Sequence, residues 1–239
     1  MAFADTPSAT FPPEQRLGVA LLLSAAGGSL DAFTWLVHGG VFANAQSGNV
    51  VLLGVFAASG QWRLALSHVP PIIAFFAGIF VAHRLRLHGT RAGDRRAARF
   101  SLMVEIALLA VVAVLPPHTP DLPIVLGVAF VAALQSSSFA QVEGWSYNSV
   151  MTTGNLRRSA EALFAGAAWP PNHGQPDHAA LRQARVFGAV CACFALGAAL
   201  GGLCAERLGD AAVVAPILLC LWALALCFRR ERPEGSQSS

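Results

Sequence analysis

Charged residues are scarce in this sequence, and one kind is missing. Only 12% of the 239 residues are charged, 55% belong to the apolar set, and all 16 basic side chains are arginine because the chain contains no lysine. Soluble domains carry about 25% charged residues, so these 16 basic and 13 acidic side chains cannot cover a 25.0 kDa globule. A soluble enzyme, a nucleic-acid-binding domain and a disordered chain are disfavoured. We expect an integral membrane protein whose main partner is the lipid bilayer.

The sequence also lacks the motifs of common catalytic and metal sites. The five cysteines form no Cys-x-x-Cys pair, the seven histidines show no His-Glu-x-x-His spacing, and no Gly-rich phosphate loop or nucleophile elbow is present. We therefore predict no enzyme activity, no catalytic residue, no metal and no cofactor. The cysteines all lie in apolar stretches and are expected to act as small packing residues.

Six segments approach the roughly 20 helical residues that a hydrocarbon core requires. These runs predict membrane-spanning helices at residues 17–37, 65–87, 100–115, 122–140, 186–204 and 211–228. The preceding segment, 1–16, has neither the basic stretch nor the cleavage site of a signal peptide and is expected to be a cytoplasmic tail. Residues 229–239 are expected to form a second cytoplasmic tail.

Two further apolar stretches, 41–59 and 149–168, begin with polar and small residues. They share a three-residue pattern, Ser47-Gly48-Asn49 and Thr153-Gly154-Asn155, at an offset of 106 residues. The same offset pairs Asp31 with Ser137. Each pattern follows a long helix and precedes a short helix and two long ones, so the chain is predicted to contain two membrane repeats, 17–117 and 122–228.

The arginine positions indicate whether the two short elements cross the membrane. If they do not cross, 14 of the 16 arginines lie on one side and only Arg63 and Arg207 lie on the other. The positive-inside rule then places both termini in the cytoplasm. Each half then has three spans, and because this number is odd the second half starts on the opposite side of the membrane and is inverted relative to the first. The two short elements are then expected to be re-entrant hairpins that meet near the midplane. The predicted fold is an all-α polytopic membrane helix bundle, with six spans arranged as an inverted 3+3 repeat and two short re-entrant helical hairpins; tight surface connections are the alternative for the hairpins.

The motifs resemble those of a known family. Gly28–Phe33 followed by Phe42–Gly54 resembles the YoaK family of bacterial inner-membrane proteins, and Met151–Arg158 is similar to that family's second signature. The resemblance covers nearly the whole chain. It implies a multi-pass protein of the bacterial inner membrane with this number of helices, and no established activity.

Asp31 is the first candidate for a functional side chain. It lies near the middle of the first predicted helix, where a carboxylate costs about 2.5 to 3.5 kcal/mol unless it is protonated, paired or hydrated. It shares one helical face with four other residues at spacings of three and four, Ser24, Gly28, Trp35 and His38. We interpret Asp31, with Ser137, as an ion or proton site; a structural carboxylate bonded to a neighbouring helix is the alternative.

The two hairpin motifs are predicted to bind the solute. Glycine permits a turn that other residues resist, and asparagine can cap a helix whose positive end then points into the protein. The candidate substrate-binding residues are Ser47, Gly48, Asn49, Thr153, Gly154, Asn155 and Arg157. Arg157 and Arg158 either line a hydrated cavity, pair with Asp31 or Glu105, or lie on a helix at the inner membrane surface.

These features favour a transporter or channel for a small polar or ionic solute with a site at the midplane. The alternative is a non-transporting sensor, assembly factor or partner of other membrane proteins. An intramembrane enzyme that uses Asp31 with Ser137 or His38 is a weaker hypothesis. Gly197-x-x-x-Gly201 permits close helix approach, either inside the bundle or in a homo-oligomer.

Overall fold

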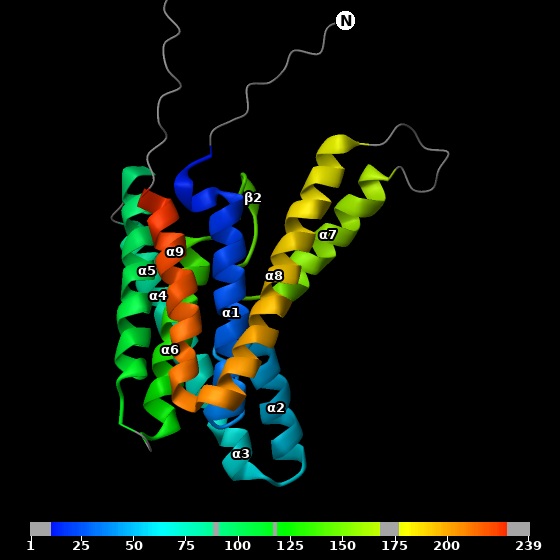
Figure 1. Cartoon of the computed structure of the whole chain (residues 1–239). Helices are drawn as coiled ribbons and strands as arrows, with labels where there is room; N and C mark the ends of the chain where they lie inside the picture. The colour runs from blue at the N-terminus through cyan, green and yellow to red at the C-terminus, as the bar shows by residue number, and fades with distance from the viewer. Residues whose placement is uncertain (1–10, 88–90, 117–118, 168–176, 229–239) are drawn as a thin grey trace, which may run out of the picture.

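The computed structural model describes residues 11–87, 91–116, 119–167 and 177–228, and it is an all-α fold (Figure 1). The longest elements are α1 (Leu17–Val37), α4 (Val69–Leu87), α5 (Arg91–Ala113), α6 (Asp121–Ser138), α8 (His178–Leu208) and α9 (Val214–Phe228). Shorter helices are η1 (Pro13–Gln15), α2 (Gln46–Ala58), α3 (Trp62–Ser67), α7 (Thr152–Gly166) and η2 (Gly209–Val213). A small antiparallel pair, β1 (Gln141–Val142) and β2 (Trp145–Ser146), sets Gln141 opposite Ser146. The tail at 229–239 lies outside the described residues.

Several helices are long and apolar enough to cross a membrane. Within the described residues four stretches qualify: Leu17–Val37, Trp62–Leu85, Asp121–Ser138 and His178–Phe228. The fourth holds 51 residues and contains two of the six predicted spans, because α9 folds back from α8 (Figure 1). The predicted span 100–115 is the apolar part of α5, which starts nine residues earlier in arginine-rich turns. Six crossings therefore remain a prediction.

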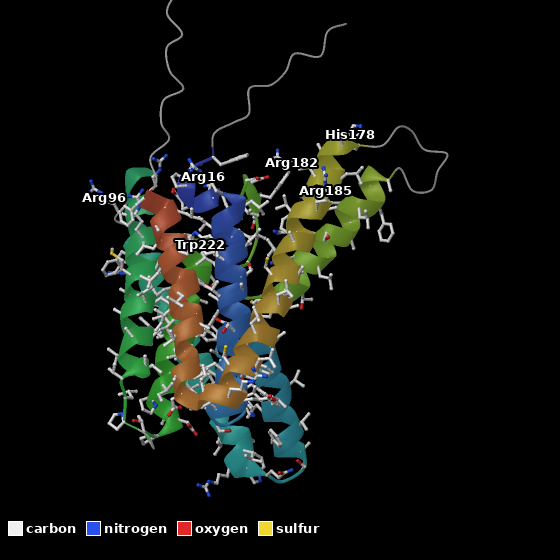
Figure 2. The ribbon with its side chains drawn as sticks, in the orientation of Figure 1. Arg16, Arg96, His178, Arg182, Arg185 and Trp222 are labelled. Carbon is white, nitrogen blue, oxygen red and sulfur yellow. The ribbon has the colours of Figure 1, made fainter. Side chains whose placement is uncertain are left out.

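The arginines separate between the two ends of the bundle. Figure 2 shows Arg16, Arg96, Arg182 and Arg185 at one end, although they come from distant parts of the chain. The helix α3, which carries Arg63, lies at the opposite end (Figure 1). This separation agrees with the charge asymmetry on which the predicted topology rests.

The helices α1 and α8 cross in close contact because both carry glycine where they meet. A Cβ atom at Gly197 would collide with the backbone of Ala25, and one at Gly201 would lie 2.6 Å from the Cα atom of Ser29. A Cβ atom at Gly28 of α1 would in turn collide with the Phe194 carbonyl group. Gly197-x-x-x-Gly201 therefore serves packing within the chain, as the first of its two interpretations predicted.

Two segments leave the ends of long helices and turn back toward the middle of α1. We call residues 38–58 the first hairpin and residues 139–166 the second. In the first, the Asn44 side chain donates a hydrogen bond to the Gly27 carbonyl (2.8 Å), at the centre of α1. In the second, the Ser149 carbonyl lies 3.2 Å from where a Cβ atom of Gly27 would be. The helices α2 and α7 thus start near the same level and run toward opposite ends (Figure 1).

Candidate functional site

Asn49 and Asn155 perform the same task in the two hairpins. The Asn49 Oδ1 atom accepts a hydrogen bond from the Phe42 N–H (3.0 Å), and its Nδ2 atom donates to the Phe42 carbonyl (2.7 Å). Asn155 makes the same pair with Asn148, at 3.2 Å and 2.6 Å. We call these two arrangements the amide clamps. Both amides are buried and engaged by backbone, so they hold the hairpins in shape rather than present free groups to a solute.

Further contacts strengthen each amide clamp. The Asn49 Nδ2 atom also donates to Gln46 Oε1 (2.9 Å), and the His68 Nδ1 atom lies 3.3 Å from its Oδ1. The Asn155 Nδ2 atom also donates to the Met151 carbonyl (3.2 Å). The clamps thereby fix the backbone that immediately precedes α2 and α7.

The motif glycines have a different role from the one predicted. Gly48 and Gly154 lie in the first turns of α2 and α7, and neither has a positive φ. Gly48 is required by close approach instead, because a Cβ atom there would lie 2.8 Å from the Phe42 ring. Gly154 has no heavy atom within 4 Å of a Cβ atom. The chain reverses elsewhere, at Gly39 and Gly40, which do have positive φ.

Asp31 anchors the first hairpin to α1. Its side chain is buried, with 6% of the residue exposed, and its Oδ1 atom accepts a hydrogen bond from the Asn44 N–H (2.8 Å). The Thr34 hydroxyl oxygen accepts from the Ala43 N–H (3.2 Å) one turn away. Asp31 therefore stabilises the backbone that leads into α2, and its carboxylate also faces the positive end of that helix.

A cavity of about 430 Å³ lies where the two hairpins meet. Asp31 and Trp35 of α1 border it, together with Ser47 from the first hairpin and Thr153 from the second. Its remaining lining comes from the same segments and from α8, namely Ala32, Leu36, Phe42, Ala45, Val150, Met151, Thr152, Phe194, Ala198 and Gly202. The structure thus brings Asp31, Ser47 and Thr153 together at one site.

Two predicted site residues lie away from this cavity. The Arg157 side chain is 78% exposed and its Nε atom pairs with Glu161 Oε1 at 2.8 Å, one helical turn along α7. Ser137 borders a separate cavity of about 260 Å³ with Glu14, Gln15 and Gln141. Neither residue therefore belongs to the lining of the Asp31 cavity.

The separation of Ser137 from Asp31 follows from extra residues in the second hairpin, between α6 and α7. The amide clamps are 106 residues apart, whereas the residues that cap the ends of α1 and α6, His38 and Phe139, are 101 apart. The second connection is five residues longer and contains β1 and β2. Gln135 in α6 corresponds to Thr34 in α1, because each accepts a hydrogen bond from the hairpin that follows its helix. The Gln135 Oε1 atom accepts from the Ser149 hydroxyl (3.3 Å), as the Thr34 oxygen accepts from the Ala43 N–H.

Asn44, Gln135 and Ser149 are polar residues that support the hairpins, and the sequence did not predict this role for them. They lie just before the motifs or at the end of the preceding helix, and all three are buried. The seven-residue spacing from Asn148 to Asn155 repeats that from Phe42 to Asn49. This repeated spacing is the sequence pattern that could have predicted the two clamps, although the earlier residue is phenylalanine in one clamp and asparagine in the other.

Together the helices and the cavity define an all-α protein whose apolar helices are compatible with a membrane. Residues 19–226 match the model of a family described as Protein of unknown function (DUF1275), and the chain belongs to that family. No curated protein and no solved structure matches the chain. The family description gives no activity, and a fold by itself does not define one.

Proposed function

We propose that this protein moves a small polar or ionic solute across the bacterial inner membrane, through the cavity beside Asp31. The observation that carries the proposal is the convergence of both hairpins on one cavity that contains a carboxylate. Non-helical backbone at membrane depth is tolerated only where it is buried in protein or lines a cavity. The segments around Asn44 and Val150 satisfy this condition, because they are buried and lie beside Gly27 at the middle of α1.

The proposed topology has six crossings, two inverted halves, and both termini in the cytoplasm. The clustering of Arg16, Arg96, Arg182 and Arg185 at one end supports this orientation (Figure 2). The matching amide clamps at Asn49 and Asn155, from which α2 and α7 run in opposite directions, support the inverted relation of the halves.

Asp31 is the proposed ion or proton site. It is the one acidic residue among the cavity's lining residues, and the hydroxyl groups of Ser47 and Thr153 complete the polar surface from either side. A non-transporting sensor or assembly factor is the alternative. It requires a fully packed bundle and a surface for association, whereas a cavity lies between the two hairpins and the glycine pair at Gly197 packs on α1 of the same chain.

The direct test is solute flux into proteoliposomes with wild-type protein, Asp31→Asn and Ser137→Ala. Asparagine keeps an oxygen that can accept from the Asn44 N–H, so the hairpin is expected to stay in place. We expect Asp31→Asn to lower flux at least tenfold. Ser137→Ala, which lies at the other cavity, should leave flux unchanged. Equal flux for wild type and Asp31→Asn across a broad panel of solutes would remove Asp31 from the mechanism.

Accessibility of the cavity to water gives a second test. In a chain whose five native cysteines are replaced, Ser47→Cys and Thr153→Cys are expected to react with a water-soluble maleimide. Ala132→Cys, at a position with 1% exposure on α6, is the unreactive control. If neither cavity position reacts, the cavity is dry and the non-transporting alternative is favoured.

A further inference from the structure

The cavity beside Asp31 is large enough to hold a small organic molecule. Its volume of about 430 Å³ falls in the range of pockets that hold small organic molecules, which is roughly 300 to 1,000 Å³. A bare or partly hydrated ion would leave most of this space unfilled and most of the lining without a partner. The size of the cavity therefore points to an organic ligand.

The lining of the cavity is mainly apolar and aromatic. Trp35 and Phe42 stack, with ring centroids 4.7 Å apart and an angle of 15° between their planes. Phe194 of α8 borders the same space. Fully hydrophilic solutes would lose hydration against these side chains without replacement. A ligand with an apolar or aromatic body would bury that surface against them.

The charge in the cavity selects the sign of the ligand. Asp31 is the only charged residue among those that line it, and no arginine or histidine is among them. An anion would face the carboxylate in a site of low dielectric constant, whereas a cation would pair with it. Aromatic faces such as those of Trp35 and Phe42 also attract cations.

The cavity borders the outside of the helix bundle. Trp35 and Leu36 line it and are also exposed, by 40% and 49%. In a membrane these exposed parts contact lipid, so an amphipathic molecule already partitioned into the bilayer can reach the cavity from the side.

We propose that the ligand of this cavity is an amphipathic organic cation, with an apolar body that packs on Trp35 and Phe42 and a positive group that pairs with Asp31. This inference rests on the proposed function and specifies the class of solute. The hydroxyl groups of Ser47 and Thr153 are placed to accept or donate hydrogen bonds to polar substituents of such a ligand.

The test uses two probes of the same shape and opposite charge, tetraphenylphosphonium and tetraphenylborate. Equilibrium dialysis against protein in nanodiscs of zwitterionic lipid measures their binding, with empty nanodiscs subtracted. We expect the phosphonium to bind at least tenfold more tightly than the borate. Tetramethylammonium, which has the charge without the apolar body, should also bind at least tenfold more weakly.

Four variants connect binding to the cavity. Asp31→Asn is expected to weaken phosphonium binding at least tenfold and Trp35→Ala several-fold. Gly202→Leu, which fills the cavity from α8, should weaken it without changing any charge. Trp222→Ala is the matched control and should bind like wild type, because Trp222 is a 62% exposed tryptophan on α9 (Figure 2) that is not among the residues lining the cavity.

The outcomes separate this inference from the proposed function. Equal binding of both probes, or unchanged phosphonium binding in Asp31→Asn, overturns the inference. If the inference is overturned but a hydrophilic solute shows flux that depends on Asp31, the proposed transport function still stands. If the phosphonium binds through Asp31 but neither it nor any other solute crosses the membrane, the ligand class stands and transport fails.

Discussion

The amide clamps offer a stringent test of the fold, because the part of the chain that the structure describes contains two that can be compared. Asn49→Ala would remove the two hydrogen bonds to the Phe42 backbone and the contacts with Gln46 and His68. A hydrogen bond contributes about 1 kcal/mol net in proteins and about 0.6 kcal/mol between membrane helices. The exposed fraction of Asn49 is 0%, so its loss also leaves polar partners without replacement by water. We expect a loss of about 3 kcal/mol in the free energy of unfolding, from these contacts together.

Asn155→Ala is the internal comparison. It removes the same pair of backbone bonds, to Asn148, and one bond to Met151, so we expect a smaller loss of about 2 kcal/mol. Asn49→Asp should be as damaging as Asn49→Ala, because a carboxylate cannot donate to the Phe42 carbonyl and would carry a buried charge. The exposed amide of Gln61, replaced by alanine, is the control and should change stability by less than about 0.5 kcal/mol.

Equilibrium unfolding of the purified variants in mixed micelles, followed by circular dichroism, measures these differences. If Asn49→Ala stays within about 0.5 kcal/mol of wild type, the range of ordinary surface substitutions, the clamp does not stabilise the hairpin. A larger loss in Asn155→Ala than in Asn49→Ala would refute the count of contacts on which the magnitudes rest.

Two more predictions concern packing inside the bundle. Gly197→Leu should lower the free energy of unfolding by about 3 kcal/mol or prevent folding, because its side chain would meet the Ala25 backbone. Gly54→Leu is the control and should be nearly neutral, because nothing lies within 4 Å of a Cβ atom there. Similar unfolding curves for the two variants would contradict the close contact between α1 and α8. Glu105 is fully buried, and the Cys220 thiol lies beside its carboxyl group. Within the described residues, neither carboxylate oxygen has a partner with the geometry of a hydrogen bond. Glu105→Gln should therefore unfold at the same or a higher denaturant concentration, whereas a loss above about 1 kcal/mol would mean that the carboxylate is paired.

Local patterns were enough to predict much of the architecture. Long apolar runs predicted the helices, since about 20 apolar helical residues suffice to cross a hydrocarbon core. The recurrence of Ser47-Gly48-Asn49 as Thr153-Gly154-Asn155 predicted two corresponding segments, and the clamps show the same bonds in both. The extent of α5 was missed because arginines at the start of a helix are compatible with either a loop or a helical turn.

The roles of individual motif residues depend on contacts that no local pattern contains. Asn49 and Asn155 were predicted to face a solute, yet their amides are held by backbone groups seven residues earlier. Ser137 was paired with Asp31 by counting residues, but the inserted β1 and β2 strands shift the end of α6 relative to the second clamp.

Composition and the lengths of the apolar runs alone predict an all-helical, lipid-compatible chain, because both are properties of the amino-acid sequence itself. The shape and lining of the cavity depend on the tertiary structure. They exist only because α1, α8 and both hairpins pack together, which places Asp31 beside Ser47 and Thr153 and leaves Arg157 outside. Such a meeting of distant segments is decided by side-chain volume and hydrogen bonding across the whole fold.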